Sequence, residues 1–96
     1  MTQTSSTGKS KYTIQIDKDA EKVLRRQGRT TKERLVKAIL VLADDPHPAN
    51  SRKLEGYHDL YRLRVGDWRI IYQVINDQLL ILVLEVGSRG EVYRDY

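Results

Sequence analysis

The sequence has 96 residues, enough for one domain with a small hydrophobic core. Hydrophobic residues make up 40% of the chain and charged residues 31%, which excludes a largely disordered polypeptide. The absence of cysteine excludes a disulfide framework, a thiolate nucleophile and a cysteine-ligated zinc site. No apolar run is long enough to span a bilayer and the N-terminus shows no signal peptide, so we expect a cytoplasmic protein without a membrane partner.

Positive charge is concentrated in the first half of the chain. There are 17 Lys and Arg against 13 Asp and Glu, a net charge of +4. Between Lys22 and Lys37 seven residues are basic and only Glu33 is acidic. This excess favours a polyanionic partner, with nucleic acid ahead of a membrane. The alternative is a helix surface whose charges are simply solvated.

The N-terminal part of the chain divides into a leader and a first strand. Residues 1–10 are rich in Ser and Thr, and we expect them to form a flexible leader to a single domain, residues 11–96. Apolar and polar residues alternate over residues 11–17, which predicts a half-buried strand.

Two helices are predicted after this strand. Asp17 is suited to cap a short helix that Gly28 closes in a left-handed conformation. Thr30 and Glu33 have the spacing of a capping box, which predicts a second helix that runs to about Ala43. The residues expected on the inner faces of these helices are Ala20, Val23 and Leu24 in the first, and Leu35, Ala38, Ile39 and Leu42 in the second.

The second half of the chain changes to the period of strands. Three runs, Leu60–Val65, Trp68–Ile75 and Leu79–Val86, are joined by Gly66-Asp67 and Asn76-Asp77, both short enough for tight hairpins. The fold class is therefore α+β. We expect an N-terminal strand, a two-helix hairpin packed on one sheet face, and a three-stranded antiparallel meander that completes one sheet.

Arginines gather on one face of the predicted meander. With a two-residue turn, Arg64 lies directly opposite Arg69, and Arg62 projects from the same face. Like charges in this position destabilise a sheet by up to roughly 1 kcal/mol, which favours a binding site for an anion. The alternative is that the guanidinium groups extend into water or pair with Glu55, Asp59 and Glu85.

The C-terminal segment adds an arginine and a tyrosine to this candidate site. Gly87 and Gly90 flank Arg89 and indicate a close-packed or sharply turning backbone there. Tyr93, beside Arg94, is suited to stack on a nucleobase. The alternative for such a tyrosine is to anchor the C-terminus to the core.

No metal or cofactor site is expected. His47 and His58 are eleven positions apart, which matches no compact ligand spacing. Asp44 and Asp45 end a helix with no acidic partner nearby. We interpret His58 as a solvated loop residue rather than a general base.

The motifs of the second half resemble a known family. The match follows the order of elements from about Ile14 to Tyr93 and is dense over residues 53–93. The matching stretches are Lys53-Leu54-Glu55-Gly56, Tyr61-Arg62-Leu63-Arg64, Trp68-Arg69-Ile70-Ile71-Tyr72-Gln73-Val74, Val86-Gly87-Ser88-Arg89 and Glu91-Val92-Tyr93. In these stretches the sequence resembles the RelE toxins of the RelE/ParE toxin–antitoxin superfamily.

This resemblance implies the toxin of a type II toxin–antitoxin system with a RelE-like fold. Such a toxin is an mRNA endonuclease that cleaves mRNA in the ribosomal A site without a cofactor and inhibits translation. The implied partners are a cognate RelB-like antitoxin, the ribosome and its mRNA, and operator DNA only through the antitoxin complex.

The resemblance also assigns roles to single residues. The two strand basics of the family fall on Arg62 and Arg64, where lysine is more common, its phosphate-binding arginine on Arg69, its C-terminal arginine on Arg89 and its stacking tyrosine on Tyr93. The predicted catalytic residues are therefore Arg64, Arg69, Arg89 and Tyr93, and the predicted RNA-binding residues are Arg62, Lys53, Arg52 and Arg94.

In the implied reaction the neighbouring 2′-hydroxyl attacks the phosphate. Arg69 and Arg62 are suited to stabilise the negative charge of the phosphorane, because a guanidinium binds phosphate oxygens bidentately. By resemblance Arg64 occupies the place of the proton acceptor and Arg89 that of the donor. Since arginine keeps its proton to pH values above about 12, either catalysis is mostly electrostatic, or a ribosomal group or water accepts the proton.

Two other classes of function are alternatives to the nuclease. A ParE-like toxin would have the same fold but would inhibit DNA gyrase. A non-catalytic nucleic-acid-binding module would use the basic helices. The presence of Arg64, Arg69, Arg89 and Tyr93 together favours the nuclease.

Overall fold

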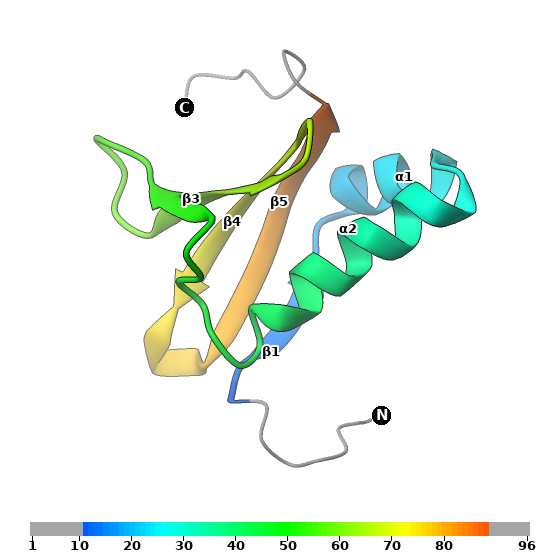
Figure 1. The fold of residues 1–96 in the computed structure, drawn as a ribbon. Helices are drawn as coiled ribbons and strands as arrows, with labels where there is room; N and C mark the ends of the chain where they lie inside the picture. Colours follow the sequence, from blue (N-terminus) through cyan, green and yellow to red (C-terminus); the bar gives the residue numbers. More distant parts are fainter. Residues whose placement is uncertain (1–10, 89–96) are drawn as a thin grey trace.

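The computed structural model describes residues 11–88, and Figure 1 shows its helices on one side of a sheet. The predicted leader and residues 89–96 lie outside the described residues, so the extent of the domain stays a prediction. The predicted α+β class is confirmed. In chain order the elements are β1 (Thr13–Ile16), α1 (Lys18–Arg26), α2 (Arg29–Val41), β2 (Ser51–Lys53), β3 (Leu60–Val65), β4 (Trp68–Ile75), the 3-10 helix η1 (Asn76–Gln78) and β5 (Leu80–Ser88).

The strands of residues 11–88 form one sheet in the order β1-β5-β4-β3-β2. The predicted meander is confirmed, because β3, β4 and β5 are antiparallel neighbours, and β1 joins it parallel to β5. Parallel strands need a crossover connection, which α1 and α2 provide after β1. The sequence analysis missed β2. Its three residues, Ser51, Arg52 and Lys53, show no apolar alternation and pair only with the outer edge of β3.

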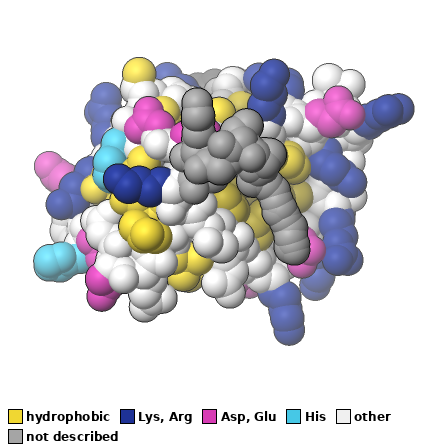
Figure 2. Space-filling model, turned by 90° about the horizontal axis from the view of Figure 1, so that it is seen from below, with side chains coloured by type: hydrophobic (Ala, Val, Ile, Leu, Met, Phe, Trp, Pro, Cys, Tyr) yellow, Lys and Arg dark blue, Asp and Glu magenta, His cyan; other side chains and the backbone are white. Residues whose placement is uncertain are grey.

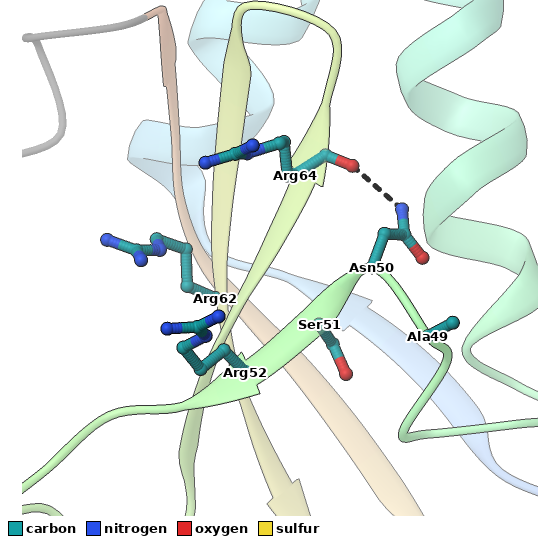
Figure 3. A pocket seen from close by; sticks show the side chains of 6 residues that line it. All are labelled: Ala49, Asn50, Ser51, Arg52, Arg62 and Arg64. Carbon is teal, nitrogen blue, oxygen red and sulfur yellow. Dashed lines mark hydrogen bonds between the residues drawn. The ribbon is translucent and has the colours of Figure 1, made fainter.

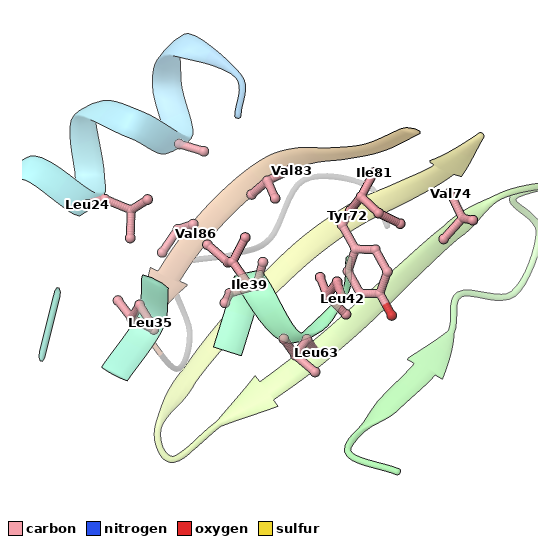
Figure 4. Packing of buried hydrophobic residues seen from close by; sticks show 12 residues of the cluster. Leu24, Leu35, Ile39, Leu42, Leu63, Tyr72, Val74, Ile81, Val83 and Val86 are labelled. Carbon is pink, nitrogen blue, oxygen red and sulfur yellow. The ribbon is translucent and has the colours of Figure 1, made fainter. Parts of the chain in front are cut away.

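Both helices cover the same face of the sheet, where side chains from α1, α2, β3, β4 and β5 form one core (Figure 4). Full burial of a large apolar side chain contributes about 2 kcal/mol, so this core fixes the helices on the sheet. None of the helices within residues 11–88 is long and apolar enough to cross a membrane. The predicted inner faces are confirmed: Ala20, Leu24, Leu35, Ile39 and Leu42 are buried, and Val23 and Ala38 pack against them.

The predicted start of α1 is confirmed and its predicted end is wrong. The Asp17 carboxylate accepts a hydrogen bond from the backbone N–H of Asp19 at 3.3 Å and caps the helix. Gly28 is extended, with φ −64°, and is not left-handed. The Gln27 side chain instead donates to the carbonyl oxygen of Val23 at 2.8 Å. Because this bond satisfies a carbonyl of the last turn, the helix ends without a left-handed glycine.

The predicted capping box of Thr30 and Glu33 is also wrong. The second helix, α2, begins at Arg29, with Gly28 as its N-cap and no side-chain hydrogen bond at the cap. Glu33 instead pairs with Arg29, with 3.4 Å between Oε2 and Nε, at the i, i+4 spacing that joins neighbours on a helix surface. The Glu33 carboxylate thus pairs with a cation on the helix surface and does not cap the helix. The helix α2 ends at Val41, two residues before the predicted end.

The two predicted hairpin turns have different outcomes. At Gly66-Asp67 a two-residue turn joins β3 and β4, and Gly66 has φ +62°, as expected for the first position of a type II′ turn. The turn expected at Asn76-Asp77 is wrong. These residues form η1, Leu79 is left-handed with φ +51°, and β5 begins one residue later than predicted.

A tertiary hydrogen bond accompanies this longer link. The Tyr12 hydroxyl donates to Asn76 Oδ1 at 2.7 Å, which connects the link to the segment just before β1. The Asn76 carbonyl oxygen also accepts from the N–H of Leu79 at 3.1 Å. The side-chain oxygen and the backbone carbonyl oxygen of Asn76 therefore both accept hydrogen bonds in the longer link. A two-residue turn does not provide this conformation.

A β-bulge interrupts the pairing of β4 with β5. Ile71 lies opposite Glu85, but its neighbour Tyr72 lies opposite Val83, so Leu84 has no partner. In a regular strand, Val83 and Val86 would point to opposite faces, because they are three positions apart. The extra residue of the bulge puts both on the same face, and both are buried on the helix side.

Tyr72 connects the core to the loop that follows α2. The predicted assignment of Tyr61 and Tyr72 to the core is confirmed, with 5.6 Å between their ring centroids. The buried Tyr72 hydroxyl donates to the carbonyl oxygen of Pro46 at 2.7 Å. Burial raises the pKa of Tyr72 from 10.0 to about 12, because the phenolate would lose its hydration.

We predict that Tyr72→Phe lowers the free energy of unfolding by about 1 kcal/mol at neutral pH, because the Pro46 carbonyl loses its donor. In the wild type, stability should also fall as the pH rises from 10.0 to about 12, since the unfolded tyrosine ionises before the folded one. This part of the alkaline loss should be missing in the variant. Urea denaturation across that interval measures both effects, and an equal alkaline loss in both proteins would contradict the assignment.

Candidate functional site

The face of the sheet that the helices leave uncovered carries four arginines. In β3 and β4, Arg64 lies directly opposite Arg69, as predicted. In β2 and β3, Arg52 lies directly opposite Arg62. Leu63, between the two arginines of β3, is buried on the helix side. Because side chains alternate along a strand, the four guanidinium groups share one surface, which we call the arginine face.

No carboxylate of the described residues pairs with these four arginines. The ion pairs formed within residues 11–88 join Arg25 to Glu21 and Arg29 to Glu33, all on the helices. Each directly opposed pair of like charges costs up to about 1 kcal/mol. The arginine face therefore holds a concentration of positive charge that lowers the stability of the fold.

The arginines of the hairpin tip surround a small cavity. It has a volume of ≈ 250 Å³ and is lined by Arg64, Gly66, Asp67 and Arg69. A guanidinium can bind two oxygens of a phosphate at once, so two of them on one cavity suit a tetrahedral anion.

The sequence analysis missed a fifth basic residue near this tip. Arg34 of α2 reaches the turn, where a Cβ built on Gly66 would lie 2.7 Å from Arg34 Nη2. The positive φ of Gly66 favours glycine in this turn, and the flexible guanidinium of Arg34 would have to move aside for a Cβ. In the sequence Arg34 is one of several helix cations, and only the fold distinguishes it from the others.

Asn50 is a second residue that the sequence analysis missed. Its side-chain Nδ2 donates to the backbone carbonyl oxygen of Arg64 at 2.7 Å (Figure 3). Its backbone carbonyl oxygen accepts a hydrogen bond from the backbone N–H of Arg64 at 3.0 Å. These two bonds fix the backbone of Arg64 from the side of the β2 edge. An asparagine in a loop carries no sequence signal for this role, because its partner is 14 residues away.

A larger open cavity lies beside Asn50. Its volume is ≈ 310 Å³, and it is lined by residues 49–52 together with Arg62 and Arg64. Figure 3 shows Arg52, Arg62 and Arg64 extending to the same side, with Arg52 and Arg62 next to each other. The arginine face thus has two adjoining cavities, and Arg64 lines both.

The neighbouring strand leaves room beside Arg69. On β5 its direct partner is Gly87, which has no side chain and is buried within the strand. Ile71, two residues along β4, is 1% exposed and pairs with Arg62 on one side and Glu85 on the other. The arginine face therefore includes the buried apolar Ile71 and, directly opposite it on β5, the acidic Glu85.

Other predicted site residues are placed apart or lie outside the description. Lys53 pairs with Tyr61, so it extends from the side of β2 opposite to Arg52. His58 is exposed in the loop before β3, in agreement with its interpretation as a solvated residue. Arg89, Tyr93 and Arg94 lie outside the described residues, and their roles stay predictions.

The basic run of residues 22–37 forms a separate surface. All seven of its Lys and Arg side chains are exposed on α1 and α2. Figure 2 shows Lys and Arg gathered on the side of the molecule where the helices lie. Two of the seven are partly neutralised by the helix ion pairs, so this surface is less concentrated than the arginine face.

Comparison with known proteins gives one consistent family. Residues 11–93 match the family described as "ParE toxin of type II toxin-antitoxin system, parDE". The mRNA interferase toxin RelE of Escherichia coli K12 is 34% identical over 88 residues, which cover 88% of this chain and 92% of that protein. Among solved structures, the archaeal RelE–RelB complex from Pyrococcus horikoshii matches with a TM-score of 0.75 and 32% identity, over 85% of this chain and 99% of that one. The isolated E. coli RelE toxin matches with a TM-score of 0.72 and 32% identity, over 85% and 90%.

The fold and its arginine-bearing sheet are thus those of a toxin of the type II toxin–antitoxin systems. The chain belongs to the RelE/ParE toxin family, and its named relatives at 34% identity are RelE proteins.

We predict that Arg69→Ala and Arg64→Ala each leave the free energy of unfolding unchanged or raise it by up to about 1 kcal/mol, because either change removes the same repulsion. The two gains should not add in the double variant. Added salt should stabilise the wild type more than either variant, since salt screens the repulsion. Thermal unfolding at low and high salt measures these effects.

Arg26→Ala is the matched control, because Arg26 is exposed on α1 and forms no ion pair with any residue between 11 and 88. It should show neither the gain nor the altered dependence on salt. A large fall in melting temperature for Arg69→Ala would show that its side chain supports the fold instead.

Proposed function

We propose that this chain is the toxin of a type II toxin–antitoxin system and that it cleaves mRNA in the A site of translating ribosomes. The observation that carries the proposal is the direct apposition of Arg64 and Arg69 on an open sheet face. The family relationship supports it, because relatives at 34% identity are named mRNA interferase toxins.

The substrate follows from the charge of the arginine face. Cations held opposite one another without an ion-paired carboxylate gain from a ligand that carries several negative oxygens. Phosphodiesters of RNA meet this requirement and offer one charge per nucleotide. Cleavage places further charge on the phosphorane, so guanidinium groups already in place stabilise the transition state more than the ground state.

Each arginine has a distinct part in the proposed reaction. The 2′-hydroxyl next to the scissile phosphate attacks the phosphorus, and the 5′-oxygen of the next nucleotide leaves. Arg69 and Arg64 bind the non-bridging oxygens as two forks from neighbouring strands. Arg62 holds the strand beside them. Arg89 as proton donor and Tyr93 as stacking platform complete the proposed set.

The arginine face does not supply a good acceptor for the proton of the 2′-hydroxyl. An arginine keeps its proton to pH values above about 12, so Arg64 suits a clamp better than a base. We therefore assign the acceptor to a ribosomal group or an ordered water. Activity then depends on the ribosome, because the ribosome both positions the mRNA and completes the catalytic set.

The proposed partner that silences the toxin is a cognate RelB-like antitoxin. The chain matches the toxins of RelE–RelB complexes from Pyrococcus horikoshii and from E. coli, the latter with a TM-score of 0.70 and 34% identity. Contact with operator DNA is proposed only for the complex with the antitoxin.

A second candidate function is inhibition of DNA gyrase by a ParE-like mechanism. It is favoured by one observation, the description of the matching family as ParE toxins. A gyrase inhibitor has no need for opposed arginines aimed at a phosphate, so we rank it second. A supercoiling assay with purified gyrase separates the two, since the nuclease should leave supercoiling unchanged.

We predict that the protein cuts mRNA during translation and does not cut the same RNA free in solution. Mapping mRNA 5′ ends in a reconstituted translation reaction measures this. Arg69→Ala should lower the cleavage rate by about 10²–10³, the usual cost of losing a donor to a developing oxyanion, while the protein stays folded. Efficient cleavage of free RNA, or full activity of the variant, would defeat the proposal.

We further predict that Arg64→Lys lowers cleavage without changing the shape of the pH–rate profile. Lysine supplies a point charge but not the fork that binds two phosphate oxygens. Single-turnover cleavage on programmed ribosomes across about pH 5.5–8.5 measures both quantities, a range in which a base of depressed pKa would titrate. A faster lysine variant with a new acid limb would show instead that this position accepts the proton.

A further inference from the structure

The arginine face repeats one arrangement on neighbouring pairs of strands. Arg64 faces Arg69 between β3 and β4, and Arg52 faces Arg62 between β2 and β3. The second pair also opposes two like charges directly, and it likewise has no carboxylate partner within residues 11–88. One scissile phosphate accounts for the first pair only. The Arg52–Arg62 pair therefore needs a ligand of its own.

The cavity beside the second pair has the character of an anion site. It is lined by Arg52, Arg62 and Arg64, with Asn50 and Ser51 at its border. The Ser51 hydroxyl donates to the carbonyl oxygen of Pro48, and one N–H of the Asn50 amide donates to that of Arg64. The cationic groups of this cavity are the guanidinium groups, which accept no hydrogen bonds and only donate them.

The spacing of the two pairs fits one strand of RNA. Arg62 and Arg64 are two residues apart on β3, which corresponds to a separation of about 6.6 Å along the strand. This is comparable with the distance between consecutive phosphates of a single RNA strand. Arg64 lines both cavities, so an RNA backbone that crosses β3 passes from one pair to the other without leaving cationic surface.

We propose that the Arg52–Arg62 pair binds the phosphate next to the scissile one, so that the arginine face holds two consecutive phosphodiesters of one RNA strand. The inference rests on the proposed function, which puts the scissile phosphate on Arg64 and Arg69. It gives Arg52, on a three-residue edge strand, a specific role in setting which phosphate is cut. With one phosphate fixed on β2, the next falls on the hairpin tip.

The test uses RNA tetranucleotides that cannot be cut, because all 2′-hydroxyls are methylated. Each has three linkages, of which one is a neutral methylphosphonate. In the first probe the two charged linkages are adjacent, and in the second they are separated by the neutral one. Both probes have the same length and net charge. Binding to the full chain without ribosomes is measured by NMR titration, and the readout is the ratio of the two affinities.

We expect the wild type to prefer the adjacent probe by about fivefold, the contribution of one additional charge pair at a partly exposed site. Arg52→Ala should bring the ratio close to one, and Arg52→Lys should give an intermediate ratio because it retains the charge but not the fork. Arg26→Ala, the same change on the helix surface, should keep the wild-type ratio. Lys53→Ala removes one positive charge, which should weaken both probes, but it should keep their ratio because Lys53 extends from the other side of β2.

A ratio near one in the wild type, or a preference that survives Arg52→Ala, would overturn the inference. Amide NMR spectra of each variant verify that it is folded. Failure of the proposed function is a separate result. If the ratio behaves as expected but no mRNA is cut on ribosomes, the cleavage activity is wrong and the two-phosphate site remains. If mRNA is cut but the ratio is one, only the second site is wrong.

Discussion

The register of the β3–β4 hairpin is the constraint on which the arginine face depends. Side chains alternate along a strand, so a slip of one residue would turn Arg64 into the core and Leu63 out of it. Burial of an unpaired guanidinium costs several kcal/mol, whereas its apposition with Arg69 costs up to about 1 kcal/mol. The burial of Leu63 in the core therefore holds Arg64 opposite Arg69 in spite of the repulsion between their charges. The two-residue turn at Gly66 adds to this constraint, because it leaves no length for the strands to shift.

The sequence was sufficient to predict the part of the site that depends on local pattern. The alternation of β3 and β4 and the short turn between them together determine that Arg64 opposes Arg69. The Arg52–Arg62 pair could not be found in the same way. Strand β2 has three residues and is joined to β3 by residues 54–59, so its pairing follows from the packed fold rather than from periodicity. Arg52 was among the predicted RNA-binding residues, but its place directly opposite Arg62 was not predicted.

At the link between β4 and β5, a tertiary contact replaced the predicted tight turn. Asn76 is engaged with Tyr12, and the expected tight turn is replaced by a longer link. The bulge at Leu84 gives Val83 and Val86 the same face, although their spacing contradicts a regular strand. Such phase changes are visible in a sequence only as an irregularity, because the energy that fixes them is the burial of residues far apart in the chain.

The distribution of charge along the sequence and its distribution in space point to different surfaces. Residues 22–37 form the most basic stretch of the chain, yet acidic neighbours at i, i+4 spacing pair with two of their cations, and the rest are exposed on the helices. On the sheet, β2 and β4 each bring an arginine directly opposite one of the two arginines of β3, so like charges lie closer together than their order in the chain suggests. Electrostatic free energy depends on the separation of charges and on their neutralisation, not on their order in the chain. The fold therefore places four arginines in two directly opposed pairs on the sheet, and the stability of the fold alone would not favour this arrangement.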